Sequence, residues 1–107
     1  MKNRPWTRDE LILALHVYFQ LPFGLLHHGT PEVKELARII DRTDNSAAMR
    51  LSNYAACDPA VIGSGRTGLV RGLSKCKPIW DEFAHDRKRL SSEAMRIKAD
   101  LLAKTAK

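Results

Sequence analysis

Apolar residues recur at helical spacing in three stretches of the first 60 residues, and a polar residue suited to cap a helix precedes each stretch. In the first, Thr7 and Glu10 have the spacing of a capping box. A helix is therefore predicted from Arg8, ending before the turn at Pro22. Its expected buried stripe is Leu11, Ile12, Leu15, Tyr18 and Phe19.

Two further helices are predicted close together. Thr30 and Pro31 begin the second, and Thr43 caps the third, which ends at Asp58-Pro59. The polar residues 41–43 form the turn between them, which is the spacing of a helix-turn-helix. The alternative is an ordinary helical hairpin in a small all-α domain. The expected buried positions are Val33, Leu36, Ala37, Ile40, Ala47, Ala48, Leu51, Tyr54 and Ala55.

Beyond residue 60 the pattern changes. Residues 64–77 hold three glycines and predict a flexible basic loop. A short helix is expected over 78–83, and Ser91 or Ser92 begins a last helix that runs to about Ala103. No segment alternates as a strand does, so the expected fold is all-α: a three-helix helix-turn-helix core, the glycine-rich basic loop, a short helix and a C-terminal linker-like helix.

Length and composition add few constraints. At 107 residues and 12.1 kDa, the chain has the size of one domain. We expect a cytoplasmic protein without a membrane anchor, because no apolar run approaches a membrane span and the basic N-terminus has no apolar segment typical of a signal peptide. Cys57 and Cys76 lack metal-ligand spacing, so two reduced thiols, no metal and no cofactor are predicted.

The distribution of charge is more informative than its total of +6. Residues 1–60 hold seven basic and seven acidic residues, whereas residues 61–107 hold eleven basic and five acidic ones. All of the excess therefore follows the helix pair, and a polyanionic partner suits it.

Four polar side chains of the third predicted helix have the chemistry to contact DNA bases. Asparagine can bond to adenine, arginine to guanine, and serine to a base or a phosphate. The base-contact candidates are Asn45, Ser46, Arg50 and Asn53. In the alternative interpretation, Asn45 or Ser46 only caps the helix and Asn53 bonds to the loop that follows.

Phosphate contacts are predicted for cations of the basic loop, where glycines let backbone N–H groups approach an anion as well. These loop candidates are Arg66, Arg71, Lys75 and Lys77. Arg42 is a further candidate, as is Arg4 as an N-terminal arm in a minor groove. The alternative is a solvated loop with no partner.

No catalytic set emerges from the sequence. His27 and His28 are adjacent but have no further ligands at metal spacing. The carboxylates fall in first turns or on exposed helix faces, and Ser64 lacks the strand-to-helix context of a nucleophile elbow. We therefore expect that this chain is not an enzyme.

Short matches in order along residues 4–90 carry a resemblance to a known family. They are Arg4-Pro5-Trp6-Thr7-Arg8-Asp9-Glu10-Leu11, Ala14-Leu15-x-x-Tyr18, Pro22-Phe23-Gly24, Glu35-Leu36-Ala37, Arg42-Thr43-x-Asn45-Ser46-x-Ala48-Met49-x-Leu51-x-Asn53, Asp58-Pro59, Gly68-Leu69 and Ile79-Trp80-Asp81-Glu82-Phe83. Together they resemble the N-terminal region of bacterial HNH endonucleases, in which a metal-dependent nuclease module lies downstream. Here the sequence has neither Cys-x-x-Cys pairs nor a His-Asn-His constellation. The resemblance implies the specificity part of a larger restriction-type enzyme. A weaker similarity, in topology and capping, is to three-helix domains of the Myb or SANT class.

The combined prediction is a DNA-binding domain over residues 1–90 and a C-terminal helix over 91–107 that leads to a nuclease module in the parent protein, with double-stranded DNA as the partner. One alternative is a small interaction or regulatory protein. Its last helix would pair with a partner or with itself as a homodimer, through the stripe Leu90, Ala94, Ile97 and Leu101. The other alternative, a self-contained enzyme, has no residue set to support it.

Overall fold

A computed structural model describes residues 4–105 of the chain. Across these residues the fold is all-α, as predicted, with six α-helices, one short 3-10 turn and no strand. The elements are α1 (Arg8–Tyr18), η1 (Phe23–Leu25), α2 (Pro31–Ile40), α3 (Asp44–Cys57), α4 (Pro59–Gly63), α5 (Leu73–Phe83) and α6 (Arg87–Thr105).

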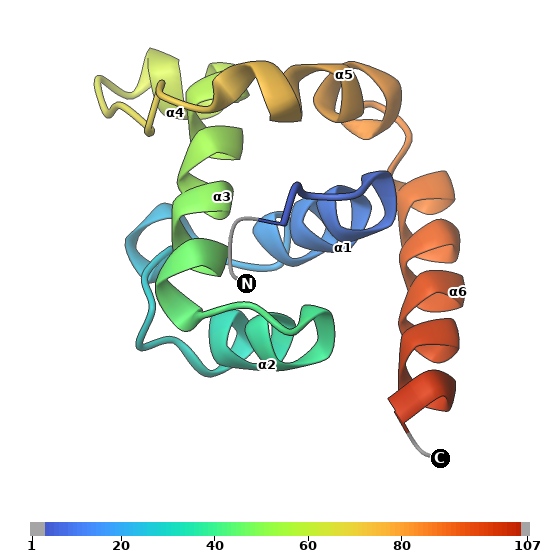
Figure 1. Cartoon of the computed structure of the whole chain (residues 1–107). Coiled ribbons are helices and arrows are strands. Elements are labelled where there is room, and N and C mark those ends of the chain that lie inside the picture. Colours follow the sequence, from blue (N-terminus) through green and yellow to red (C-terminus); the bar gives the residue numbers. More distant parts are fainter. Residues whose placement is uncertain (1–3, 106–107) are drawn as a thin grey trace.

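Helix α1 lies at the centre of the fold, with α3 and α6 on opposite sides of it and α2 and α5 across the other two (Figure 1). Its sequence explains this position, because apolar residues surround the helix axis and a helix of that kind must be covered on all sides. Ile12, Ala14 and Leu15 are at most 1% exposed. In residues 4–105 no helix combines the length and the apolar character needed to cross a membrane.

The first three helices begin at the predicted residues, Arg8, Pro31 and Asp44, and two of them have the predicted side-chain cap. The Thr7 side chain accepts from the Glu10 N–H and the Glu10 carboxylate accepts from the Thr7 N–H, which completes the capping box. The Thr43 hydroxyl accepts from the Ser46 N–H at 3.0 Å. Thr30 differs from the expectation, because its buried hydroxyl donates to the Leu25 carbonyl at 2.7 Å instead of capping α2.

The predicted flexible loop is shorter than expected, and it is packed. Helix α5 begins at Leu73 rather than at residue 78, and Pro78 lies inside it. The preceding segment runs along α3, where the Leu69 N–H donates to the Ser52 carbonyl at 3.0 Å. A Cβ at Gly68 would lie 2.3 Å from the Ala56 nitrogen. Glycine is therefore required here for close approach to α3, and not for flexibility.

The last helix also begins earlier than predicted. Helix α6 starts at Arg87, since the Asp86 carboxylate accepts from the Arg89 N–H at 3.2 Å and so caps it ahead of the serines. The predicted domain boundary between residues 90 and 91 therefore falls inside α6.

The apolar stripe of α6 is used within the fold. Leu90, Ala94 and Ile97 are each at most 2% exposed, and α6 packs along α1. A homodimer formed through these three positions would have to displace α1.

Candidate nucleic-acid interface

A groove of about 350 Å³ lies between the first half of α3 and residues 69–72. It brings together residues that are far apart in the sequence but were predicted to share a function. Four base-contact candidates and one phosphate-contact candidate line it: Asn45, Ser46, Arg50, Asn53 and Arg71. The other lining residues are Thr43, Met49, Leu69 and Gly72.

The first turn of α3 forms one wall of the groove. Thr43 caps this helix, so neither Asn45 nor Ser46 is needed for that role with its side chain. Asn45 is exposed and its amide lies 3.9 Å from the Met49 sulfur, and Met49 itself is 51% exposed. Asn45 and Met49 are therefore accessible, as a groove-reading helix requires.

Arg50 is held in position by one end of its guanidinium group. Its Nη1 donates to Asn53 Oδ1 at 3.2 Å and to the Gly72 carbonyl at 3.3 Å, and lies 3.9 Å from Cys76 Sγ. Its Cζ lies 4.9 Å from the centre of the Trp6 ring, a cation–π contact. Within the described part of the chain, its Nε and Nη2 have no acceptor. Arg50 is thus preorganised while two of its donor nitrogens are still free to bind a ligand.

Asn53 has a structural role in place of the predicted base contact. It is only 3% exposed, and its amide nitrogen donates to the Leu69 carbonyl at 2.6 Å and to the Arg71 carbonyl at 2.7 Å. Its oxygen accepts from Arg50. The alternative interpretation, a bond to the following loop, is the one seen. Leu69 and Arg71 lie outside the helices, so their carbonyls have no helical partner and accept from the Asn53 amide instead.

The four cations of residues 64–77 that were predicted to contact phosphate differ in how many contacts they already make. Arg71 and Lys75 are exposed and, among residues 4–105, pair with no carboxylate. Lys77 bonds both oxygens of Asp81, at 2.8 and 3.0 Å, but an exposed pair of this kind is easily exchanged for another anion. Arg66 is exposed and lies over the Phe23 ring, at 5.3 Å. The loop candidates thus stay available for phosphate, although Lys75 and Lys77 belong to α5.

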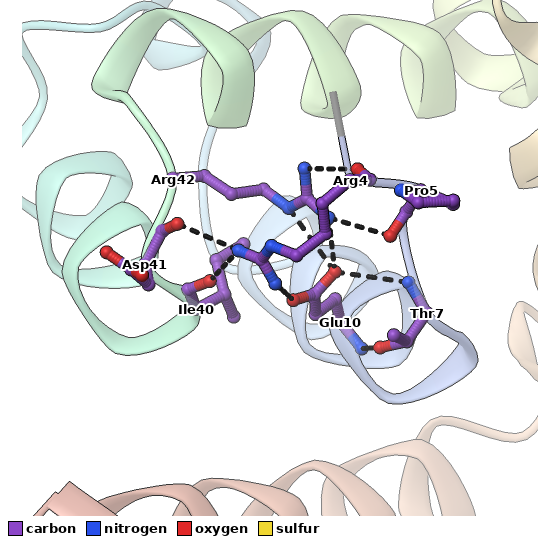
Figure 2. A network of polar contacts seen from close by, with 7 residues as sticks. All are labelled: Arg4, Pro5, Thr7, Glu10, Ile40, Asp41 and Arg42. Atoms are coloured by element: carbon purple, nitrogen blue, oxygen red, sulfur yellow. Dashed lines mark hydrogen bonds and ion pairs between the residues drawn. The ribbon is translucent and has the colours of Figure 1, made fainter. Parts of the chain in front are cut away.

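Arg42 is not available to phosphate, contrary to the prediction. Its side chain is 7% exposed and its Nη2 lies 2.8 Å from the Glu10 carboxylate, which is itself 9% exposed (Figure 2). It also donates to the carbonyls of Arg4 and Pro5, at 3.1 and 2.9 Å. A buried carboxylate requires such a partner, and this need fixes the arginine.

Arg4 is not a free N-terminal arm either. It donates to the other Glu10 oxygen at 2.9 Å and to the carbonyls of Ile40 and Asp41, at 2.9 and 2.8 Å. Asp41 has the left-handed conformation, with φ of 56°, at the end of α2. Both arginines therefore join the N-terminal segment to the turn between α2 and α3 and fix the direction of α3 (Figure 2).

Other chemistry that the sequence offered has structural explanations. His27 Nδ1 accepts from the Gly29 N–H at 3.1 Å in a surface turn. No group of three or more His, Cys, Asp or Glu side chains in residues 4–105 is arranged to hold a metal ion. Both cysteines are free thiols, and burial raises the pKa of each, that of Cys57 to about 11. They therefore stay protonated at neutral pH.

Comparisons of the chain with protein families, with curated proteins and with solved structures found no match.

Proposed function

We propose that this chain is a DNA-binding domain that contacts duplex DNA through the groove between α3 and residues 69–72. One observation carries the proposal. Side chains suited to base edges, Asn45, Ser46 and Arg50, line the same groove as Arg71, a cation suited to phosphate.

In this proposal the first half of α3 enters the major groove. Asn45 and the two unoccupied nitrogens of Arg50 bond to base edges, while Met49 makes apolar contact with a thymine methyl group. Arg66, Arg71 and Lys75 contact the DNA phosphates on either side of the major groove. The neutralised phosphates supply most of the affinity, and α3 selects the sequence.

We further propose, on the resemblance over residues 4–90, that the domain supplies site selection to an HNH nuclease module. In this arrangement the groove between α3 and residues 69–72 supplies the DNA contacts. Addition of an HNH module to this domain is expected to direct cleavage to DNA that the isolated domain binds. Equal cleavage of bound and unbound sequences would refute this part of the proposal.

The test of DNA binding is the fluorescence anisotropy of a labelled duplex titrated with the protein between 50 and 200 mM salt. Three neutralised phosphates give a slope of log affinity against log salt of about −3. The triple reversal Arg66→Glu, Arg71→Glu and Lys75→Glu is expected to abolish binding at 50 mM salt. A duplex that shows no salt-sensitive binding would refute the proposal.

A matched control separates the groove from net charge. Lys88→Glu, Lys98→Glu and Lys104→Glu also reverse three exposed cations, but on α6, which lies across α1 from α3 (Figure 1). This variant is expected to retain most of the affinity. An equal loss in both triple variants would show that binding follows net charge alone. A concentration-dependent dimer in light scattering, with no affinity for DNA, would favour the interaction protein instead.

A further inference from the structure

A second cavity, of about 450 Å³, lies at the other end of α3, where α3 meets α4. The end of α5 and the start of α6 complete its walls. Its lining residues are Phe19, Asp58, Pro59, Trp80, Asp81, Ala84, His85 and Arg87. None of them belongs to the groove proposed to bind DNA.

One wall of this cavity is aromatic. The half-buried rings of Phe19 and Trp80 lie 5.4 Å apart between centroids. Tyr18 and Tyr54 support Trp80 from the core, at 6.0 and 6.5 Å. Because the Arg87 guanidinium covers the Phe19 ring, with Cζ 3.4 Å from its centre, Trp80 is the ring that offers a planar ligand a stacking surface.

Three charged side chains line the cavity; Asp81 is bonded by Lys77, and the other two have opposite charges that are not paired with each other. Asp58 and Arg87 both line it, yet neither forms an ion pair with any residue of the described range 4–105. A carboxylate and a guanidinium that share a cavity without meeting can both bind a ligand placed between them.

Asp58 is positioned as an acceptor. Its Oδ2 accepts from the Tyr18 hydroxyl at 2.6 Å and its Oδ1 from the Ala60 N–H at 2.9 Å. Burial and the bond to Asp58 raise the pKa of Tyr18, so the phenol keeps its proton and donates it. Each carboxylate oxygen keeps a further lone pair, so two more donors can be accepted side by side.

Arg87 is positioned as a donor. Its Cζ lies 3.4 Å from the centre of the Phe19 ring, the distance of a stacked guanidinium. Nε lies 3.4 Å from the Ala84 carbonyl, and within the described residues Nη1 and Nη2 have no acceptor. A planar ligand bonded to these two nitrogens lies in the guanidinium plane, and Arg87 and Trp80 line the same cavity.

We propose that this cavity binds a guanine base. Guanine presents two neighbouring donors, N1–H and the 2-amino group, and two neighbouring acceptors, O6 and N7. The donors match the free lone pairs of Asp58, the acceptors match Arg87, and the base lies against Trp80. Adenine places an amino group where Arg87 needs an acceptor. The base belongs either to a free guanine nucleotide or to an unpaired guanine in a nucleic-acid strand.

The experiment follows the indole N–H resonance of Trp80 by ¹⁵N–¹H NMR while the full chain is titrated with GMP, AMP or CMP. Trp80→Phe identifies the resonance. GMP is expected to shift it saturably, and AMP and CMP are not. No shift with GMP, or equal shifts with all three nucleotides, would overturn the proposal.

Asp58→Asn provides a change of specificity. Asparagine keeps an oxygen to accept from Tyr18 or to cap α4, but its amide donors oppose those of guanine. The variant is expected to bind GMP about tenfold or more weakly and to gain affinity for XMP, which has a carbonyl at the 2-position. Unchanged GMP affinity would contradict the assignment.

Arg87→Lys tests the site without a change in the core, since Arg87 is exposed at the start of α6. The lysine keeps the charge but loses the paired donors, so GMP affinity is expected to fall about tenfold. An unchanged affinity would count against the proposal. The source of the base is found by comparing GMP with a nine-residue single-stranded oligothymidine that carries one central guanine. Tighter binding of the oligonucleotide indicates a strand, and equal binding a free nucleotide.

Discussion

Gly68 gives the sharpest test of how the groove is built. An added Cβ would lie 2.3 Å from the Ala56 nitrogen, 2.4 Å from the Ser52 oxygen and 2.8 Å from the Ala55 carbonyl carbon. All three are backbone atoms of α3, which cannot turn aside as a side-chain end can. Gly68→Ala is therefore expected to push residues 68–71 away from α3.

The cost follows from the hydrogen bonds that join this segment to α3. They are the bond from the Leu69 N–H to Ser52, at 3.0 Å, and the two bonds from the Asn53 amide to Leu69 and Arg71, at 2.6 and 2.7 Å. At about 1 kcal/mol each, with part of the desolvation cost of a buried amide added, their loss amounts to about 2–4 kcal/mol. That is a large fraction of the roughly 5–15 kcal/mol expected for a domain.

The assay is urea unfolding followed by circular dichroism. Gly24→Ala is the matched control, because a Cβ there meets nothing within 4 Å and the backbone conformation is ordinary. The control is expected to stay within about 0.5 kcal/mol of the parent protein. A Gly68→Ala variant as stable as the control would refute the close packing of this segment on α3.

Two further predictions concern ion pairs. Glu10→Gln removes the charge between two arginines, one of them buried, and is expected to lower the free energy of unfolding by about 2–4 kcal/mol in chemical denaturation. Its control, Glu35→Gln, removes an exposed pair with Arg38 and is expected to lower it by under about 1 kcal/mol. Equal losses in the two variants would contradict the buried network. Hydrogen bonds from Arg8 and Arg89 lower the pKa of Glu82 from 4.5 to about 2. The stability that comes from this lowered pKa is present above pH 4.5 and is lost as the pH falls toward 2. The melting temperatures of the parent protein and of Glu82→Gln should therefore converge over that range. A constant difference between the two melting temperatures would argue against the ion pairs.

Helix starts governed by short-range contacts could be predicted from the sequence. The bonds of Thr7 with Glu10 and of Thr43 with Ser46 span three residues, and α1 and α3 begin where these caps indicate. The start of α5 could not be predicted in this way. Pro78 suggested a first turn, yet it lies inside the helix, because packing of Cys76 and Ile79 into the core outweighs one missing hydrogen bond.

Part of the groove could be predicted, because the helical period depends only on positions close in the sequence. The helical period places Asn45 and Met49 on the outer face of α3, and the structure leaves both exposed. The roles of Arg42 and Asn53 depend on partners distant in the sequence: Glu10 lies 32 residues from Arg42, and the Leu69 carbonyl lies 16 residues from Asn53. No local pattern encodes such pairs, so both side chains were predicted as ligands rather than as supports.

The aromatic contacts give the molecule a pair of intrinsic optical probes. Its two tryptophans are divided between the two proposed sites, since Trp6 lies under the guanidinium of Arg50 and Trp80 lines the cavity beside α4. Any ligand that draws Arg50 away from the indole changes the emission of Trp6, while a stacked base quenches Trp80. With single tryptophan-to-phenylalanine variants, occupancy of each site can be followed separately by fluorescence and without an added label.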